Sequence, residues 1–143
     1  MITEEDSMKP FPNLENPPLL GYPAERPGST LSYNNNIFSI NGAPCTGHYI
    51  FVVLTSTNPF GATFQDHNGL DVDVYLHTAF HHDDLALGQP VNYAGTLDFM
   101  NGQLTSWSNH SGHYRPDAIF RDQAPTAFNV PLFRVVLNDG TLA

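Results

Sequence analysis

An asparagine–glycine pair between two strand-like segments is the feature that most constrains this chain. Asn101-Gly102 separates Asn92–Met100 from Gln103–Ser108, and such a pair is the strongest short-range signal for a two-residue β-hairpin. The predicted register pairs Met100 with Gln103, Phe99 with Leu104, Asp98 with Thr105, and Thr96 with Trp107. The apolar face then holds Tyr93, Leu97, Phe99 and Leu104. Trp107, the single tryptophan, falls on the opposite face unless a bulge intervenes.

Two other segments have clear strand patterns. His48–Thr55 contains an unbroken apolar run from Tyr49 to Leu54, which is typical of a central strand covered on both faces. Asp71–Thr78 alternates between apolar and polar residues, so one of its faces is predicted to belong to the core. The other face carries Asp71, Asp73, Tyr75 and His77, and we expect it to be solvated.

The remaining elements are short. Asn35–Ile40, which precedes the turn signal Asn41-Gly42, and Leu132–Leu137 are predicted strands. Pro116–Gln123 is a predicted short helix, because proline is favoured at the first helical position. No long amphipathic helix is predicted.

Length and composition agree with a mainly β fold. The chain has 143 residues, 41% of them hydrophobic and only 13% charged, whereas soluble domains average about 25% charged residues. Helix surfaces normally carry Glu, Lys and Arg, so this balance favours strands and turns. We therefore predict a β-rich α+β domain over residues 31–143, with an antiparallel sheet that forms a barrel or a sandwich and one or two short helices.

Residues 1–30 hold six of the twelve prolines. Proline fixes φ and lacks a backbone donor, so this segment is predicted to be an extended arm. Leu19, Leu20 and Tyr22 are the side chains that could attach it to the body. This arm is also the segment through which we expect any homo-oligomer to form.

The charge balance excludes some classes of partner. The net charge is −9, and five scattered basic residues cannot build a surface that follows phosphates, so nucleic acids and anionic membranes are disfavoured. A neutral partner, such as a small molecule or a glycan, suits the chain better. Cys45 is the only cysteine, which excludes an internal disulfide and predicts a buried, inert thiol. Without a recognisable signal sequence, we expect a cytoplasmic protein or one exported without a cleaved signal.

The first segment with candidate chemistry is His77–Asp84. His-x-Asp occurs twice in it, as His81/Asp83 and His82/Asp84, and His110 or His113 would complete a site of two histidines and one carboxylate for a divalent metal. The metal ligands would be His81, His82, Asp83 and His113. The alternative is a polar loop whose histidines bond to backbone carbonyls.

The second segment is Ser106–Pro116. In a functional interpretation His113 is a general base or ligand, Tyr114 a donor, Ser111 a nucleophile or donor, and Arg115 the residue that holds an anion. In a structural interpretation the same residues form a strand-to-helix turn, with Tyr114 packed into the core.

These two segments together resemble the core of the plant IQ-motif calmodulin-binding family and of related uncharacterised bacterial and fungal effector-like proteins. The resemblance covers residues 82–116, under a third of the chain. It depends on four groups of residues in a fixed order: His82 with Gly88, Ala94-Gly95, Asn101-Gly102, and the block Ser111-Gly112-His113-Tyr114-Arg115-Pro116. It implies that His82, Gly88, Gly95, Gly112, His113 and Tyr114 matter, either for chemistry or for folding.

The sequence departs from the family pattern in one important place. Asp83 and Asp84 stand where the family has a pair of serines, so any role of those serines is altered here. The chain also lacks a basic amphipathic helix, and we do not expect it to bind calmodulin.

The leading hypothesis is an effector- or toxin-like domain with a pocket between His77–Asp84 and Trp107–Arg115 for a small-molecule or glycan ligand. The predicted catalytic residues are His82, His113 and Tyr114, and the predicted ligand-binding residues are Trp107, Ser111, Arg115 and Asp84. The alternatives are a lectin-like module that uses an exposed Trp107, the metal-dependent enzyme described above, and a structural module that pairs through a sheet edge.

Overall fold

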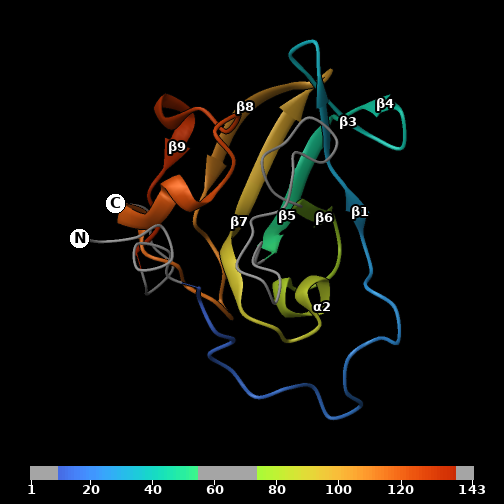
Figure 1. Cartoon of the computed structure of the whole chain (residues 1–143), viewed down its shortest axis with the longest axis vertical. Coiled ribbons are helices and arrows are strands. Elements are labelled where there is room, and N and C mark those ends of the chain that lie inside the picture. The colour runs from blue at the N-terminus through green and yellow to red at the C-terminus, as the bar shows by residue number, and fades with distance from the viewer. Residues whose placement is uncertain (1–9, 55–73, 138–143) are drawn as a thin grey trace, which may run out of the picture.

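The computed structural model describes residues 10–54 and 74–137, whose strands form two sheets. The larger sheet contains, in spatial order, β1 (Ser29–Thr30), β6 (Val74–His77), β5 (Gly47–Leu54), β7 (Val91–Met100), β8 (Gln103–Ser108) and β9 (Phe133–Arg134). The smaller sheet contains β2 (Ser32–Asn34), β3 (Ile37–Ile40) and β4 (Ala43–Pro44). The predicted mainly β class is confirmed. Within the described ranges the strands form no closed barrel, because β1 and β9 are separate edges of the larger sheet (Figure 1).

The predicted hairpin is present, but its register changes partway along. Met100 pairs with Gln103 and Phe99 with Leu104, as the Asn101-Gly102 turn requires. A bulge follows, so Asp98 pairs with Ser106 rather than Thr105, and Leu97 rather than Thr96 lies opposite Trp107. One extra residue moves the following side chains to the other face. Trp107 was predicted to lie on the outer face unless a bulge intervened; the bulge is present, and Trp107 lies on the inner face.

Trp107 lies in the middle of an aromatic core. Its side chain is 1% exposed, and its ring centroid is 4.5 Å from that of Phe133 and 5.5 Å from that of Phe128. The central strand β5 contributes Phe51, Val52 and Val53, all fully buried, which confirms the prediction from its apolar run. In β6, Val74 and Leu76 are buried while Tyr75 and His77 are half-buried, as the alternation predicts. The predicted positions Asp71 and Asp73 lie outside the described residues.

The helices differ from the predictions in position. A one-turn helix, α2 (His82–Ala86), begins where a polar loop was predicted. The predicted Pro116–Gln123 helix is a 3₁₀ helix, η1 (Ala118–Gln123), that begins two residues later. Part of the predicted strand Leu132–Leu137 is taken by a second 3₁₀ helix, η2 (Val130–Leu132), and the two residues of β9 pair in parallel with β8.

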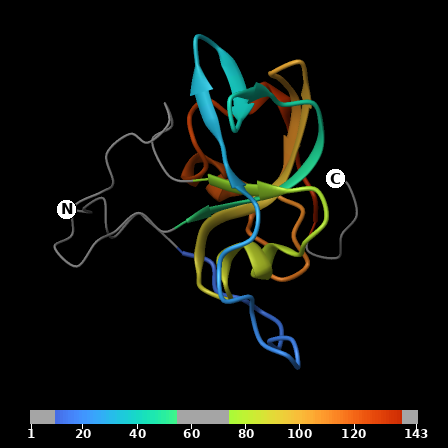
Figure 2. The same cartoon turned by 90° about the vertical axis from the view of Figure 1, so that its right-hand side faces the viewer.

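The described part of the arm lies against the body. Phe11 forms an antiparallel bridge with Val91 and is 7% exposed, and Tyr22 donates a hydrogen bond to Asp83. Leu19 and Leu20, in contrast, are fully exposed, so the prediction that they attach the arm is wrong. The loop that carries them projects from the end of the molecule opposite the β2–β4 sheet (Figure 2).

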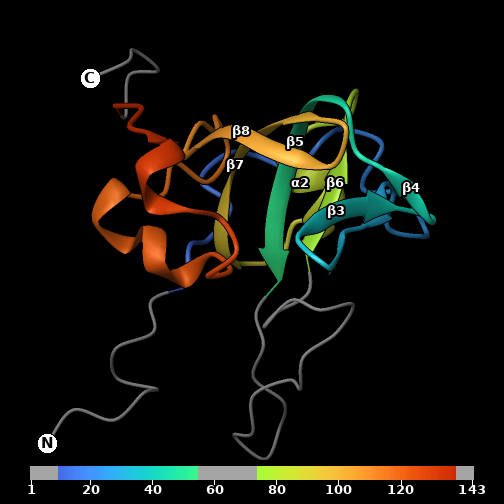
Figure 3. The same ribbon diagram turned by 90° about the horizontal axis from the view of Figure 1, so that it is seen from above.

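The layers place the smaller sheet beside the larger one. Seen from above, β3 and β4 lie on one side of β5, and the C-terminal 3₁₀ segments lie on the other side (Figure 3). The smaller sheet therefore stands beside the β5–β6 part of the larger sheet. In the described part of the chain, no helix is long and apolar enough to cross a bilayer.

Candidate functional site

His82, the first predicted catalytic residue, is buried beneath the larger sheet. Its Nε2 lies 2.7 Å from the carbonyl oxygen of Gly95 on β7, and only 7% of the residue is exposed. Burial lowers the pKa of His82 to about 4, the bond to Gly95 opposing this shift. The imidazole is thus neutral at physiological pH, and its hydrogen bond to Gly95 connects α2 to β7.

The Tyr114 and Ser111 side chains also form hydrogen bonds that stabilise the fold. The Tyr114 hydroxyl donates to the carbonyl of Gln89 at 2.7 Å, and burial raises the pKa of that hydroxyl. Ser111 Oγ accepts the Tyr114 backbone N–H at 3.2 Å, and both residues are at most 4% exposed. This arrangement agrees with the strand-to-helix turn of the structural interpretation.

Trp107 presents neither its ring nor its N–H to solvent. The Nε1–H donates to the carbonyl of Asn129 at 2.8 Å, and the ring is enclosed by core aromatics. Stacking on a sugar needs an accessible aromatic face. The exposed tryptophan on which the lectin hypothesis depended is therefore not present.

The two predicted segments do meet, at His113. Its Nε2 lies 3.6 Å from Asp83 Oδ1, and its ring centroid is 5.7 Å from that of His81. The Asp83 side chain is 5% exposed, and its other oxygen accepts the Tyr22 hydroxyl at 3.1 Å. The partly accessible His113 thus lies between this buried carboxylate and the exposed His81 ring.

Asp84 and Arg115 have local partners. Asp84 Oδ2 accepts the backbone N–H of His81 at 3.2 Å and so caps α2. Arg115 forms an ion pair with Glu15 of the arm at 3.1 Å and donates to the carbonyl of Gly112. Among the described residues, no group of three or more His, Cys, Asp or Glu side chains could hold a metal ion. His82 in particular is kept from the predicted ligand set by its bond to Gly95.

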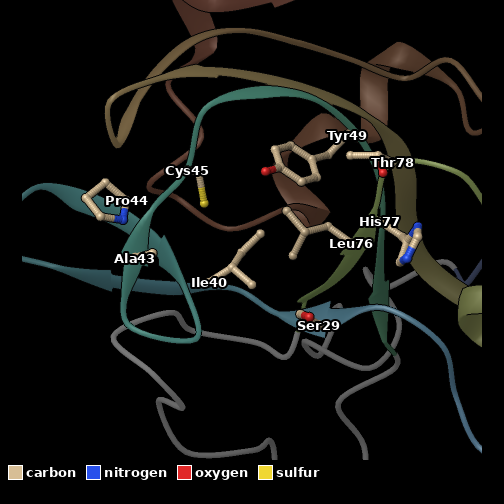
Figure 4. A pocket seen from close by; sticks show the side chains of 9 residues that line it. All are labelled: Ser29, Ile40, Ala43, Pro44, Cys45, Tyr49, Leu76, His77 and Thr78. Carbon is tan, nitrogen blue, oxygen red and sulfur yellow. The ribbon is translucent and has the colours of Figure 1, made fainter.

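A pocket of about 270 Å³ lies elsewhere, between the two sheets. We call it the inter-sheet pocket. It is lined by Ser29, Ile40, Ala43, Pro44, Cys45, Tyr49, Leu76, His77 and Thr78. Ile40 and Leu76 extend toward its middle, while His77 and Thr78 lie together on the side opposite Ala43 and Pro44 (Figure 4).

Among the polar side chains of the inter-sheet pocket, the Cys45 thiol is protonated, and Tyr49 and His77 form hydrogen bonds with backbone groups. Burial raises the pKa of the Cys45 thiol to about 11, so this sulfur is protonated at neutral pH. The Tyr49 hydroxyl donates to the carbonyl of Thr46. His77 Nδ1 accepts the backbone N–H of Ala79 at 2.9 Å, and its ring packs edge-on against Phe80.

Sequence reasoning did not find the inter-sheet pocket. It singled out Cys45 and His77 separately, the first as inert and the second as part of a solvated face. The lining residues lie in β1, β3, β4, β5 and β6 or directly after β4 and β6, and only the pairing of these strands brings them together. The one local signal of this pocket was His77, which lies at the end of a predicted strand whose opposite face is apolar.

No protein-family model, curated protein or solved structure matches this chain. The resemblance to the IQ-motif calmodulin-binding family therefore stays a prediction.

Proposed function

We propose that this chain is a small-molecule-binding β domain whose ligand occupies the inter-sheet pocket. The observation that carries the proposal is a concave site of about 270 Å³, walled by strands of both sheets and lined mainly by apolar groups with a few polar ones. Ligand sites in proteins have this composition, at volumes of about 300–1,000 Å³. The two sheets form the walls of this open concave site.

The volume of the inter-sheet pocket favours a ligand-binding site over an empty packing defect. An apolar cavity of about 150 Å³ is enough to hold a benzene molecule, and the inter-sheet pocket is nearly twice as large. A second cavity, about 150 Å³ and lined in part by Asn109, Asp117 and Val136, is a weaker candidate. The Asn109 amide is already bonded to the carbonyls of Pro116 and Val136.

This proposal moves the ligand from the site predicted by the sequence. Of the glycan and small-molecule classes expected there, it retains the small molecule, because Trp107 is buried and the new pocket is largely apolar. Any effector-like role would then depend on what the domain binds rather than on catalysis by His82, His113 and Tyr114.

Binding of naphthalene, a neutral fluorescent molecule larger than benzene by about the same factor as the pocket is larger than a benzene cavity, tests the proposal. Ala43→Trp places a large side chain at the pocket wall and should weaken probe binding at least tenfold. Ala24→Trp makes the same change at an exposed alanine of the arm and should leave binding within about twofold. Absence of saturable binding to the unaltered protein, or equal loss in both variants, would refute the proposal.

A further inference from the structure

We propose that the loop Asn13–Tyr22 of one copy of this chain inserts its exposed leucines into the inter-sheet pocket of a second copy. This inference goes beyond the proposed function and shares only the pocket with it. The loop of a neighbouring copy and a small molecule then compete for the same site.

The first observation is a group of exposed leucines on one loop. Leu19 and Leu20 are fully exposed, and Leu14 is 55% exposed. The first two are the central residues of a turn, which the Gly21 N–H closes by donating to the carbonyl of Pro18 at 2.9 Å. The loop projects from one end of the molecule (Figure 2). Scattered single leucines on a surface need no explanation, whereas neighbouring ones on a projecting turn are typical of an interaction surface.

The second observation is that the base of this loop is fixed. The Asn13 side-chain amide donates to the Tyr22 hydroxyl at 2.8 Å across the base, and that hydroxyl donates to Asp83 of the body at 3.1 Å. Glu15 forms an ion pair with Arg115 at 3.1 Å. The two consecutive prolines that lead into the turn restrict its backbone. A loop held in this way loses little conformational entropy on binding, so its leucines are preorganised for a concave partner.

The third observation is a match between these leucines and the inter-sheet pocket. Truncation of one leucine in a protein core can leave a cavity of about 150 Å³, so a pocket of about 270 Å³ has room for about two leucine side chains. Ile40 and Leu76 extend toward the middle of the pocket, and none of its nine lining residues is Asp, Glu, Lys or Arg (Figure 4). The turn from Pro18 to Gly21 carries no charged residue either. Burial of the leucines therefore removes apolar surface from water without removing the hydration of a charged group.

The positions of the loop and the pocket make a second copy the partner. The loop projects from the end of the molecule opposite the β2–β4 sheet (Figure 2), and that sheet forms one wall of the pocket. One copy therefore cannot fill its own pocket. A contact between two different surfaces is heterologous, so it repeats into an open chain or closes into a ring. Because only the tip of one loop is buried, the contact is smaller than the roughly 800 Å² per partner of standard interfaces, and we expect the association to be weak.

Small-angle X-ray scattering tests for this assembly. Between about 0.02 and 1 mM protein, the forward scattering per unit concentration should rise about twofold, as a dissociation constant near 1 mM predicts. Salt at about 0.3 M screens the repulsion between copies of net charge −9. Leu19→Ser/Leu20→Ser and Ala43→Trp, which alter the loop and the pocket wall, should both stay monomeric. Ile119→Ser/Val130→Ser removes two exposed apolar side chains outside the loop and should assemble like the unaltered protein.

A mixture of the two monomeric variants identifies the contact. The leucine variant keeps the pocket and Ala43→Trp keeps the loop, so together they should form a pair that cannot extend. In NMR spectra of the ¹⁵N-labelled leucine variant, Ala43→Trp added to about 1 mM should shift amides of the pocket wall, whereas added unlabelled leucine variant should not. The unaltered protein should produce the same shifts as Ala43→Trp, so this measurement does not depend on the folding of that variant.

Three results would overturn the inference: an unaltered protein that stays monomeric at about 1 mM, a leucine variant that assembles like it, or no shifts in either mixture. Naphthalene binding is measured at about 10 μM, where the expected association leaves the protein monomeric. Failure of naphthalene to bind would refute the proposed function and leave the assembly result standing.

Discussion

At the scale of single residues, groups that resemble catalytic side chains hold the backbone in place. His82 bonds to the carbonyl of Gly95, and the Tyr114 hydroxyl bonds to the carbonyl of Gln89. Each connects a segment outside the sheet to β7 or to the turn before it. An unpaired buried carbonyl costs about 1–3 kcal/mol. Such residues are therefore needed for folding even when they touch no ligand.

The buried imidazole of His82 predicts a pH dependence of stability. Its folded-state pKa is about 4, below the unfolded value of about 6.5. As pH falls below about 6.5, the unfolded state binds a proton that the folded state does not, so stability decreases until the pH reaches about 4. His82→Gln removes this titration. Between pH 7.5 and 4.5, the unaltered protein should lose about 2–3 kcal/mol more of its free energy of unfolding than the variant does.

Urea denaturation at the two pH values measures that difference. His110→Gln removes an exposed histidine whose charge also opposes protonation of His82, and it should recover only a small part of this difference. Parallel losses in His82→Gln and the unaltered protein would show that His82 is not the group responsible.

At the scale of elements, patterns that act over a few residues were predictable and those set by tertiary contacts were not. The turn at Asn101-Gly102 needs positive φ, and both residues adopt it, at 50° and 83°. The bulge at Thr105 has no such residue signature, although it decides the face of Trp107. The helix α2 is only five residues long, too short to be stable from propensity alone, and it depends on burial of Leu85 and Ala86.

Gly95 and Gly112, both within the segment that resembles the plant family, are predicted to respond differently to substitution by alanine. A Cβ at Gly95 would lie 1.7 Å from the carbonyl oxygen of Ser108 on the neighbouring strand, whereas a Cβ at Gly112 would meet no atom within 4 Å. Gly95→Ala must push β7 and β8 apart, and we expect it to lower the free energy of unfolding by about 3 kcal/mol or more. Gly112→Ala should change it by less than about 1 kcal/mol. Thermal or urea unfolding of the two variants side by side checks this, and comparable destabilisation would contradict the close strand approach at Gly95.

At the scale of the whole molecule, neither the inter-sheet pocket nor the attachment of the arm could be predicted from local patterns. The pocket depends on the pairing of β1 with β6 and of β3 with β4, which sequence periodicity does not specify. The arm was predicted to be extended, but its anchor is a contact between Tyr22 and Asp83, 61 residues apart. Proline content indicates the conformation of such a segment and says nothing about where it docks.

This anchor predicts that one hydroxyl group controls how firmly the arm is held. Tyr22 donates to the buried carboxylate of Asp83 at 3.1 Å and accepts from Asn13 at 2.8 Å, and the ring packs over Gly88, where a Cβ would lie 2.5 Å from it. Tyr22→Phe keeps the ring but removes the donor to a charged acceptor. Such hydrogen bonds contribute about 1.5–3 kcal/mol, so local opening of the arm should increase at least about tenfold.

Hydrogen exchange at the amide of Leu14 reports that opening, because its N–H donates to the carbonyl of His113 at 2.7 Å only while the arm is docked. In Tyr22→Phe this amide should exchange about tenfold faster, while amides of the central strand β5 keep their protection. Tyr33→Phe is the matched control, since that hydroxyl donates to Asn36 at an exposed position. Unchanged exchange at Leu14 in Tyr22→Phe would mean that the Phe11–Val91 bridge and the Glu15–Arg115 ion pair hold the arm without Asp83. Faster exchange throughout β5 would mean that the arm and the body open as one cooperative unit.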